Sequence, residues 1–158
     1  MSIVTANEIT RLMDLSPSPY HVVENLAQYL SQQGFQRLTE VDSWSLQGGG
    51  RYFLSRQGSA LLAFVMPESV TQPAPLRLCS SHTDSPTLKL KPALLKRKGG
   101  YWVFDVAVYG SPILSTWFDR DLSMAGLVSG LDEKGGLHHT VFHLGKPITR
   151  IPNLAIHL

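Results

Sequence analysis

The apolar residues of this 158-residue chain change their spacing near Leu88, and this change limits the folds that the chain can adopt. Before that point, helical spacing and capping residues predict a helix over residues 5–13 and a second over residues 18–34. From Leu88 onward no long segment has the helical period, and short apolar runs alternate with glycine-containing turns. We therefore expect an α/β part followed by a mostly β part, with a boundary within residues 86–92.

The strands expected from this pattern form hairpins and one buried strand. The run from Ser59 to Met66 is apolar on both faces, which predicts a central strand that is covered on two sides. A further strand is expected at Leu76–Ser81, with Cys79 inside it. The expected hairpins join 51–56 to 59–66, the alternating residues 88–91 to 101–109 across the KRKGG turn, and 121–129 to 137–144.

Composition and charge exclude some classes of protein. The longest apolar run, Ala60–Met66, is far shorter than the ~20 residues that span a bilayer, so no membrane partner is expected. With Cys79 as the single cysteine, no intrachain disulfide is possible, and a reducing cytoplasm is expected. The basic cluster 89–98 could suggest nucleic acid, but KRKGG is typical of a solvated hairpin turn, so no nucleic-acid partner is expected. The apolar residues at the C-terminal end are atypical of a chain terminus and suggest part of a longer protein.

The stretch SSHTDSP at residues 80–86 carries the strongest chemical signal in the chain. In an extended chain His82 and Asp84 lie on the same face, because side chains two residues apart point the same way. A carboxylate beside an imidazole fixes its tautomer and raises its basicity, as a metal-binding histidine requires. Taken alone, the His-x-Asp pair is more often part of a solvated turn than of a metal site.

Other residues that could carry chemistry are weaker candidates. Cys79 is expected inside an apolar strand, where thiols are usually inert. His21 is expected to be a packed or solvated residue of the second helix, and His138, His139 and His143 to be structural or solvent-facing residues of a strand. Three nearby serines lack the strand-to-helix turn that exposes a catalytic nucleophile: Ser80, Ser81 and Ser85. The glycine runs at 48–50 and 99–100 lack the flanking residues of a phosphate-binding loop.

Three stretches, SSHTDSPTLKLKP (80–92), STWFDRDLSMAGLV (115–128) and RIPNLAIHL (150–158), together resemble the M18 family of metallopeptidases, the aspartyl aminopeptidases. The stretch LSPSPYHVVENLAQYLSQQGF (15–35) resembles the N-terminal part of the same family. The resemblance implies the start of an α/β zinc-aminopeptidase catalytic domain, at residues 1–90, interrupted by a β-rich inserted dimerisation or lid domain, at 91–158 and incomplete.

The resemblance also implies roles for individual residues. His82 would be a zinc ligand, and Asp84 a catalytic residue that orients His82. His157 would either bind metal or contact substrate in a neighbouring subunit. Two Zn²⁺ ions are expected in each active site, with the remaining ligands and catalytic glutamates beyond Leu158. Arg120 is a local candidate for binding an acidic substrate residue, but pairing with Asp119 or Asp121 is the favoured interpretation.

The expected function is therefore removal of N-terminal Asp or Glu from peptides through a metal-activated water, in a homo-oligomer assembled through residues 91–158. The 158-residue chain alone is expected to be inactive, because it supplies one or two metal ligands where a zinc site needs three or more. Two alternatives remain at this point: a non-catalytic oligomerisation module, or a metal-dependent hydrolase of another family that shares only His-x-Asp.

Overall fold

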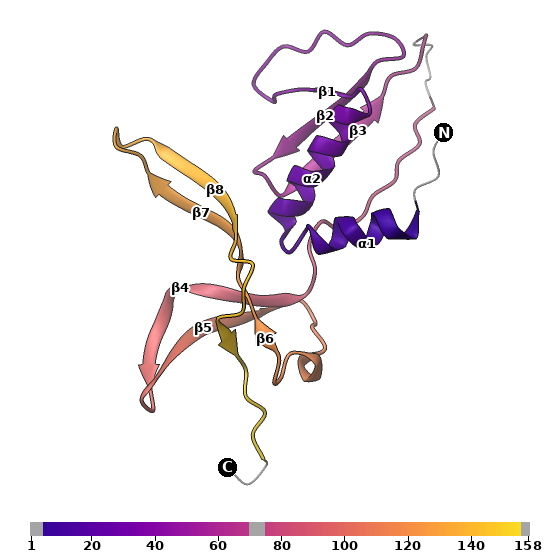
Figure 1. Ribbon diagram of the computed structural model, residues 1–158. Helices are drawn as coiled ribbons and strands as arrows, with labels where there is room; N and C mark the ends of the chain where they lie inside the picture. The colour runs from indigo at the N-terminus through magenta and orange to yellow at the C-terminus, as the bar shows by residue number, and fades with distance from the viewer. Residues whose placement is uncertain (1–4, 70–74, 156–158) are drawn as a thin grey trace. The chain divides into compact units, whose positions relative to one another are not determined.

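The computed structural model describes residues 5–69 and 75–155 and begins with two helices (Figure 1). Helix α1 (Ala6–Asp14) starts at a capping box, in which the Thr5 backbone N–H donates to Glu8 Oε2 over 2.7 Å and Thr5 Oγ1 accepts from Glu8 N. Helix α2 (Pro19–Gln32) has proline in its first turn, and Gly34 follows it with a φ of 80° that favours glycine. Both predicted helices are confirmed.

A three-stranded sheet follows α2 in the order β1–β2–β3. Strand β1 (Gln36–Arg37) pairs in parallel with β2 (Arg51–Arg56), which pairs antiparallel with β3 (Ala60–Val65). The β2–β3 hairpin is confirmed, and Gln57 and Gly58 of its turn both have the positive φ typical of tight hairpin turns. The prediction of a covered central strand was wrong for β3, which is an edge strand of this sheet with most of its residues exposed. The central strand is β2.

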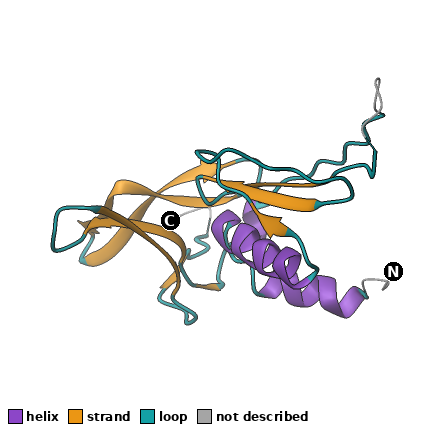
Figure 2. Cartoon of the chain, turned by 90° about the horizontal axis from the view of Figure 1, so that it is seen from above, coloured by secondary structure: helices purple, strands orange, loops and turns teal. Residues whose placement is uncertain are grey.

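The buried core is built around β2, because both of its faces are covered. Helix α2 lies on one side of the sheet, where Val23 and Phe53 are buried and Phe53 is only 1% exposed (Figure 2). On the opposite face the Tyr52 ring packs at 5.6 Å from Phe64, which also contacts Trp44 of the loop before β2. The Tyr52 hydroxyl accepts a hydrogen bond from the Gln47 backbone N–H over 2.8 Å, so the loop is fixed to the strand.

The strand predicted at Leu76–Ser81 was wrong, because residues 75–86 form no ladder with any described strand. Leu76 is 86% exposed and Leu78 is 76% exposed, so the side of this segment that carries the alternating apolar residues is not buried against the described part of the chain. Cys79 is also exposed, which corrects the expectation that it lies inside an apolar strand.

The longest hairpin joins β4 (Thr87–Lys98) to β5 (Tyr101–Tyr109) through Gly99 and Gly100, both with positive φ, as predicted. Its register is interrupted by a bulge: Leu95 pairs with Phe104, but Leu90 pairs with Val106. Asp105 lies opposite the bulge and forms ion pairs with two lysines of β4, at 3.2 Å to Lys91 and 2.5 Å to Lys96. These two ion pairs tie the first residue of the bulge, Lys91, and a residue beyond it, Lys96, to the opposite strand.

The remaining strands form two antiparallel pairs. The predicted strand at 121–129 is two strands, β6 (Asp121–Leu122) and β7 (Ala125–Leu131). Strand β7 pairs with β8 (Leu137–His143), which confirms the third hairpin, and β6 pairs with β9 (Thr149–Arg150). After β5 the only helix in the described part of the chain is a short 3₁₀ turn at Leu114–Thr116, so the β-rich character of this half is confirmed.

The chain forms two compact units that are not continuous in sequence. The first comprises residues 1–83 with 125–143, and the second comprises residues 84–124 with 144–158. The β7–β8 hairpin therefore belongs with α2 and the first sheet, although it follows β4–β5 in the sequence. These units differ in their bounds from the expected catalytic and inserted domains at 1–90 and 91–158, which stay a prediction. Within residues 5–69 and 75–155, neither helix has the length and apolar character required to cross a membrane.

Candidate metal centre

Residues 82–86 are irregular backbone, in which the first stretch of the first unit ends at Thr83 and the second unit begins at Asp84. His82, at the end of the first unit, has an exposed side chain. The next residue, Thr83, is anchored to the β2–β3 turn, because its hydroxyl donates to the Ser59 carbonyl over 2.8 Å. An exposed imidazole beside an anchored residue is accessible to a metal ion, and histidine nitrogen is among the ligands that zinc prefers.

Asp84, at the start of the second unit, is held by the end of β5. The Tyr109 hydroxyl donates a 2.5 Å hydrogen bond to Asp84 Oδ2. The Lys89 ammonium lies 3.6 Å from the centre of the Tyr109 ring, in a cation–π contact. The hydrogen bond to Asp84 raises the pKa of Tyr109 above its usual value, and the carboxylate charge acts in the same direction. Tyr109 therefore keeps its proton and acts as the donor.

The sequence analysis did not identify Tyr109. The signal for a strand at residues 101–109 was clear, but the position of its last residue depends on the bulge in β4. The bulge brings Tyr109 opposite Thr87, three residues after Asp84. Without that shift, continuation of the pairing from Leu95–Phe104 would place Tyr109 opposite Leu90.

The described residues supply only part of a metal centre. No group of three or more His, Cys, Asp or Glu side chains within residues 5–69 and 75–155 is arranged to hold a metal ion. His157, the other predicted ligand, lies outside the described residues. A protein zinc site needs at least three ligands, so His82 fits as one donor of a set that other residues must complete.

The FDRD stretch at residues 118–121 contacts the RIPN stretch at residues 150–153 within the second unit. Phe118 forms a β-bridge with Ile151, and Asp119 accepts from the Asn153 backbone N–H over 3.1 Å. Arg150 pairs with Asp121 at 2.9 Å. The FDRD and RIPN stretches therefore form one small structure, which leads directly to the residues before His157.

Arg120 does not form the predicted pair with Asp119 or Asp121. Its guanidinium donates to the Thr116 carbonyl over 3.4 Å, whereas Asp121 pairs with Arg150 and Asp119 accepts from the backbone of Asn153. That prediction was wrong, because the β6–β9 pairing brings another arginine to Asp121.

A histidine pair that sequence reasoning missed joins α2 to the β7–β8 hairpin. The rings of His21 and His143 meet edge to face, with centroids 6.1 Å apart. Nδ1 of His21 is also 2.7 Å from the Ser18 hydroxyl oxygen, within hydrogen-bond distance. His21 is thus packed, in agreement with the expectation for this residue, but no signal in the sequence pairs it with a residue 122 positions later.

This pair predicts a pH dependence of stability. Partial burial lowers the pKa of His21, and the nearby His143 lowers it further, while Glu24 acts in the opposite direction. Because the unfolded chain then binds more protons, the free energy of unfolding is expected to fall as the pH decreases below about 6.5. We expect His143→Gln in the whole protein to reduce this fall, measured as the change in urea midpoint between pH 7.5 and 5.5.

The matched control for this prediction is His139→Gln on the same strand. His139 is exposed, and its Nδ1 is 2.7 Å from the Ser129 hydroxyl oxygen. The His139→Gln substitution should leave the pH dependence of the urea midpoint unchanged. An equal fall in stability in wild type and His143→Gln would show that the histidine pair does not contribute.

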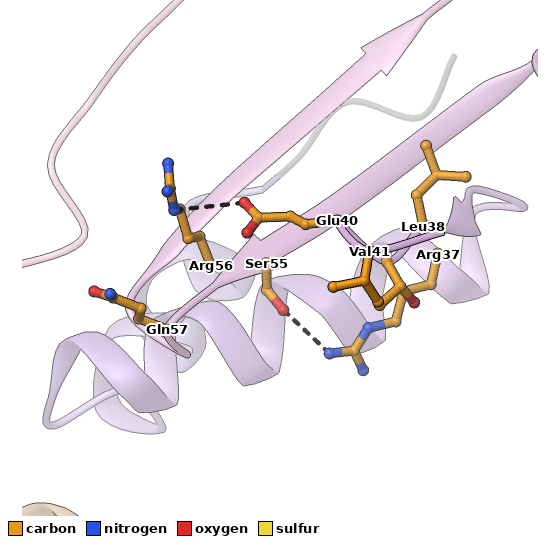
Figure 3. Close-up of a pocket in the computed structure, with 8 residues that line it drawn as sticks. Arg37, Leu38, Glu40, Val41, Ser55, Arg56 and Gln57 are labelled. Atoms are coloured by element: carbon orange, nitrogen blue, oxygen red, sulfur yellow. Dashed lines mark hydrogen bonds and ion pairs between the residues drawn. The ribbon is translucent and has the colours of Figure 1, made fainter. Parts of the chain in front are cut away.

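A separate pocket of about 470 Å³ lies between β1, the start of the following loop and the β2–β3 turn (Figure 3). Within it, Arg37 donates to the Ser55 hydroxyl over 3.1 Å, and Arg56 pairs with Glu40 at 3.5 Å. Each charged side chain that lines the pocket therefore has a partner among the other lining residues. The pocket contains neither His82 nor Asp84 and is distinct from the candidate metal centre.

Comparison with known proteins identifies similar chains over nearly the whole length. The sequence model of the family described as aminopeptidase I zinc metalloprotease (M18) matches residues 12–158. A probable M18 family aminopeptidase 2 from Pseudomonas savastanoi is 41% identical over 152 residues, which cover 96% of this chain and 35% of that protein. Aspartyl aminopeptidase 1 of Schizosaccharomyces pombe is 42% identical over 148 residues, which cover 92% of this chain and 31% of that protein.

The solved structure of the mApe1 dodecamer of S. cerevisiae is similar to this chain, with a TM-score of 0.81 and 30% identity. The match covers 96% of this chain and 36% of that one. The similarity confirms the predicted α/β fold. The chain spans about a third of the length of the curated relatives that it matches.

Proposed function

Because this chain belongs to the M18 family of zinc metalloproteases, we propose that the whole protein is a zinc aminopeptidase that removes N-terminal Asp or Glu from peptides. The observation that carries the proposal is the exposed His82, followed two residues later by Asp84, which Tyr109 holds. The family match across residues 12–158 excludes the alternative of another hydrolase family that shares only His-x-Asp. The relative from S. pombe that is named an aspartyl aminopeptidase supports the acidic specificity.

In this proposal the residues of the chain hold and orient the metal. His82 would coordinate zinc through one ring nitrogen. Asp84 would accept a hydrogen bond from the N–H of the other ring nitrogen and so fix the tautomer of His82. His157 would add a second ligand or a substrate contact, and other residues of the whole protein would supply the remaining ligands. When bound, zinc supplies a Lewis acid and lowers the pKa of a coordinated water towards ~7; two ions per site are proposed from the family resemblance.

The assembly and location of the protein are part of the same proposal. We propose a homo-oligomer joined through residues 91–158, in the cytoplasm, with peptides as the only other partners. Two observations support the oligomer: the S. cerevisiae structure is a dodecamer, and Tyr101 and Trp102 on β5 are 76% and 68% exposed. Large exposed aromatic side chains are typical of surfaces that another protein covers.

The experiment that tests this function compares peptides that differ only at their first residue. The whole protein is expected to release Asp from an Asp-initiated peptide with a kcat/KM at least about 100-fold above that for the Asn-initiated one, because a charge-specific site rejects the neutral isostere. Acetylation of the N-terminus and removal of zinc by a chelator should each abolish release.

Residues 1–158 tested alongside the whole protein should be inactive, because too few ligands are present. Equal cleavage of the Asn and Asp peptides would contradict the acidic specificity. Absence of any peptide cleavage by the zinc-loaded whole protein would instead favour the non-catalytic oligomerisation module.

A further inference from the structure

We propose that the Tyr109 hydroxyl positions the Asp84 carboxylate at the metal centre, and that Lys89 holds the Tyr109 ring in place for this purpose. The inference rests on the proposed function, because it assigns Asp84 a role beside a metal-binding His82. Tyr109 acts through Asp84 and is therefore a positioning residue. It neither binds the metal nor touches the substrate in this account.

The first support is the way the hairpin brings Tyr109 to Asp84. Tyr109 is the last residue of β5 and pairs with Thr87, the first residue of β4. Cross-strand partners share a face of the hairpin, so a side chain at 109 lies next to the segment that enters β4. The 2.5 Å hydrogen bond between the Tyr109 hydroxyl and Asp84 Oδ2 spans this short gap.

The turn after Tyr109 keeps the two segments close. Gly110 has a φ of 71°, in the region that favours glycine. A Cβ atom at position 110 would lie 3.3 Å from Cβ of Pro86, so the backbone passes close to the residue that follows Asp84 and Ser85. The entry to β4 and the exit from β5 are thus packed against each other by their own backbones.

Lys89 restrains the ring that carries the hydroxyl. Thr87 and Lys89 lie two residues apart on β4 and share the face on which Tyr109 lies. The Lys89 ammonium sits 3.6 Å from the ring centre, so the tyrosine ring is covered on that side by a cation. A tyrosine that is held by both its ring and its hydroxyl offers a fixed donor to the carboxylate.

The bulge in β4 is the element that makes this arrangement possible. It shifts the pairing between Leu95–Phe104 and Leu90–Val106, and only the shifted register places Tyr109 opposite Thr87. Asp105 lies opposite the bulge and forms ion pairs with Lys91, inside the bulge, and with Lys96, beyond it. The bulge therefore aims a side chain at the candidate centre, as bulges beside functional sites often do.

The chemistry of a carboxylate allows this role. An ionised carboxylate offers about four acceptor positions on its two oxygens, so a phenol and an imidazole can donate to it together. A donor that fixes one oxygen also fixes the plane of the carboxylate, and hence the direction in which it orients the imidazole of a metal ligand. Loss of the phenol hydroxyl would leave Asp84 with more orientations, and the metal with a less ordered ligand.

The test measures zinc affinity of the whole protein, by competition of the metal-free protein with a chromophoric chelator. Tyr109→Phe keeps the ring and the Lys89 contact but removes the hydroxyl. We expect it to weaken zinc binding by about 10–100-fold, the range for residues that orient metal ligands. Tyr29→Phe, at an exposed position of α2, is the matched control and should bind zinc as wild type does.

A second arm separates positioning through Asp84 from a general structural effect. In an Asp84→Ala background, adding Tyr109→Phe should cause no further loss, because the two residues act as one unit. Unchanged zinc affinity in Tyr109→Phe would overturn the inference while leaving the proposed function intact, provided that His82→Ala loses zinc. A further full loss in the Asp84→Ala background would also overturn it. Normal zinc binding by His82→Ala would overturn the proposed function itself, and the inference with it.

Discussion

Replacing His82 by alanine in the whole protein is expected to weaken zinc binding and lower peptide release by more than about 100-fold, beyond the range for residues that only orient a ligand. The fold should not change, because His82 is exposed and lies outside the core around β2. The expected result is therefore a folded protein that, compared without metal, has the urea midpoint of wild type, with less bound zinc and little activity. Metal content by elemental analysis, with turnover of an Asp-initiated peptide, measures both effects.

Two further variants are compared with His82→Ala: one at the neighbouring carboxylate and one at a histidine outside the proposed site. Asp84→Asn keeps the size of the side chain but removes its charge, and should weaken zinc binding by about 10–100-fold, less than His82→Ala. His138→Ala is the matched histidine control, since His138 is exposed on β8 in the first unit and takes no part in the proposed site. Full zinc content and turnover in both His82→Ala and Asp84→Asn would return HTDSP to the interpretation of a solvated turn.

The second large effect is expected at His157, which we propose either binds metal or contacts substrate in the active site of a neighbouring subunit. His157→Ala alone should be inactive, or nearly so, as His82→Ala alone should be. Mixed oligomers of the two variants should recover activity, because some active sites then combine an intact His82 from one subunit with an intact His157 from another. The measurement is turnover after dissociation, mixing and reassembly.

The control for mixing is a pair of differently tagged subunits, which verifies that hybrid oligomers have formed. The same variant mixed with itself should stay inactive. Absence of recovery in verified hybrids would contradict a role in a neighbouring subunit. Full activity of His157→Ala would remove this residue from the site.

Helices and hairpins could be predicted from the sequence because their signals are local. The Thr5–Glu8 capping box, Pro19 and Gly34 mark the helix ends, and each is found where the sequence predicts it. Gly99 and Gly100 give the positive φ values that a tight hairpin turn requires. Local chemistry was therefore sufficient to define these elements.

Pairing over longer distances could not be predicted in the same way. Alternating apolar residues show that Leu76 and Leu78 favour a buried face, but not whether a partner strand is present to bury them. For the same reason β3 was mistaken for the central strand: the distant strand β1 pairs with β2, which makes β2 central and leaves β3 at the edge.

The candidate site was predicted in part. His82 and Asp84 are only two positions apart in the sequence, so their motif could be identified directly, whereas Tyr109 reaches Asp84 only because a bulge shifts the register of β4. The position of a bulge depends on the pairing of both strands, and the residue types at Lys91 and Asp105 do not predict it. The pairing of His21 with His143 likewise depends on the β7–β8 hairpin joining the first unit.

The central claim, that His82 binds zinc with Asp84 orienting it, is tested most directly by anomalous diffraction at the zinc absorption edge from crystals of the whole protein. The account predicts a zinc peak about 2.0–2.1 Å from one ring nitrogen of His82, with the Asp84 carboxylate within hydrogen-bond distance of the other. Zinc bound by a ligand set that leaves out His82 would contradict the account.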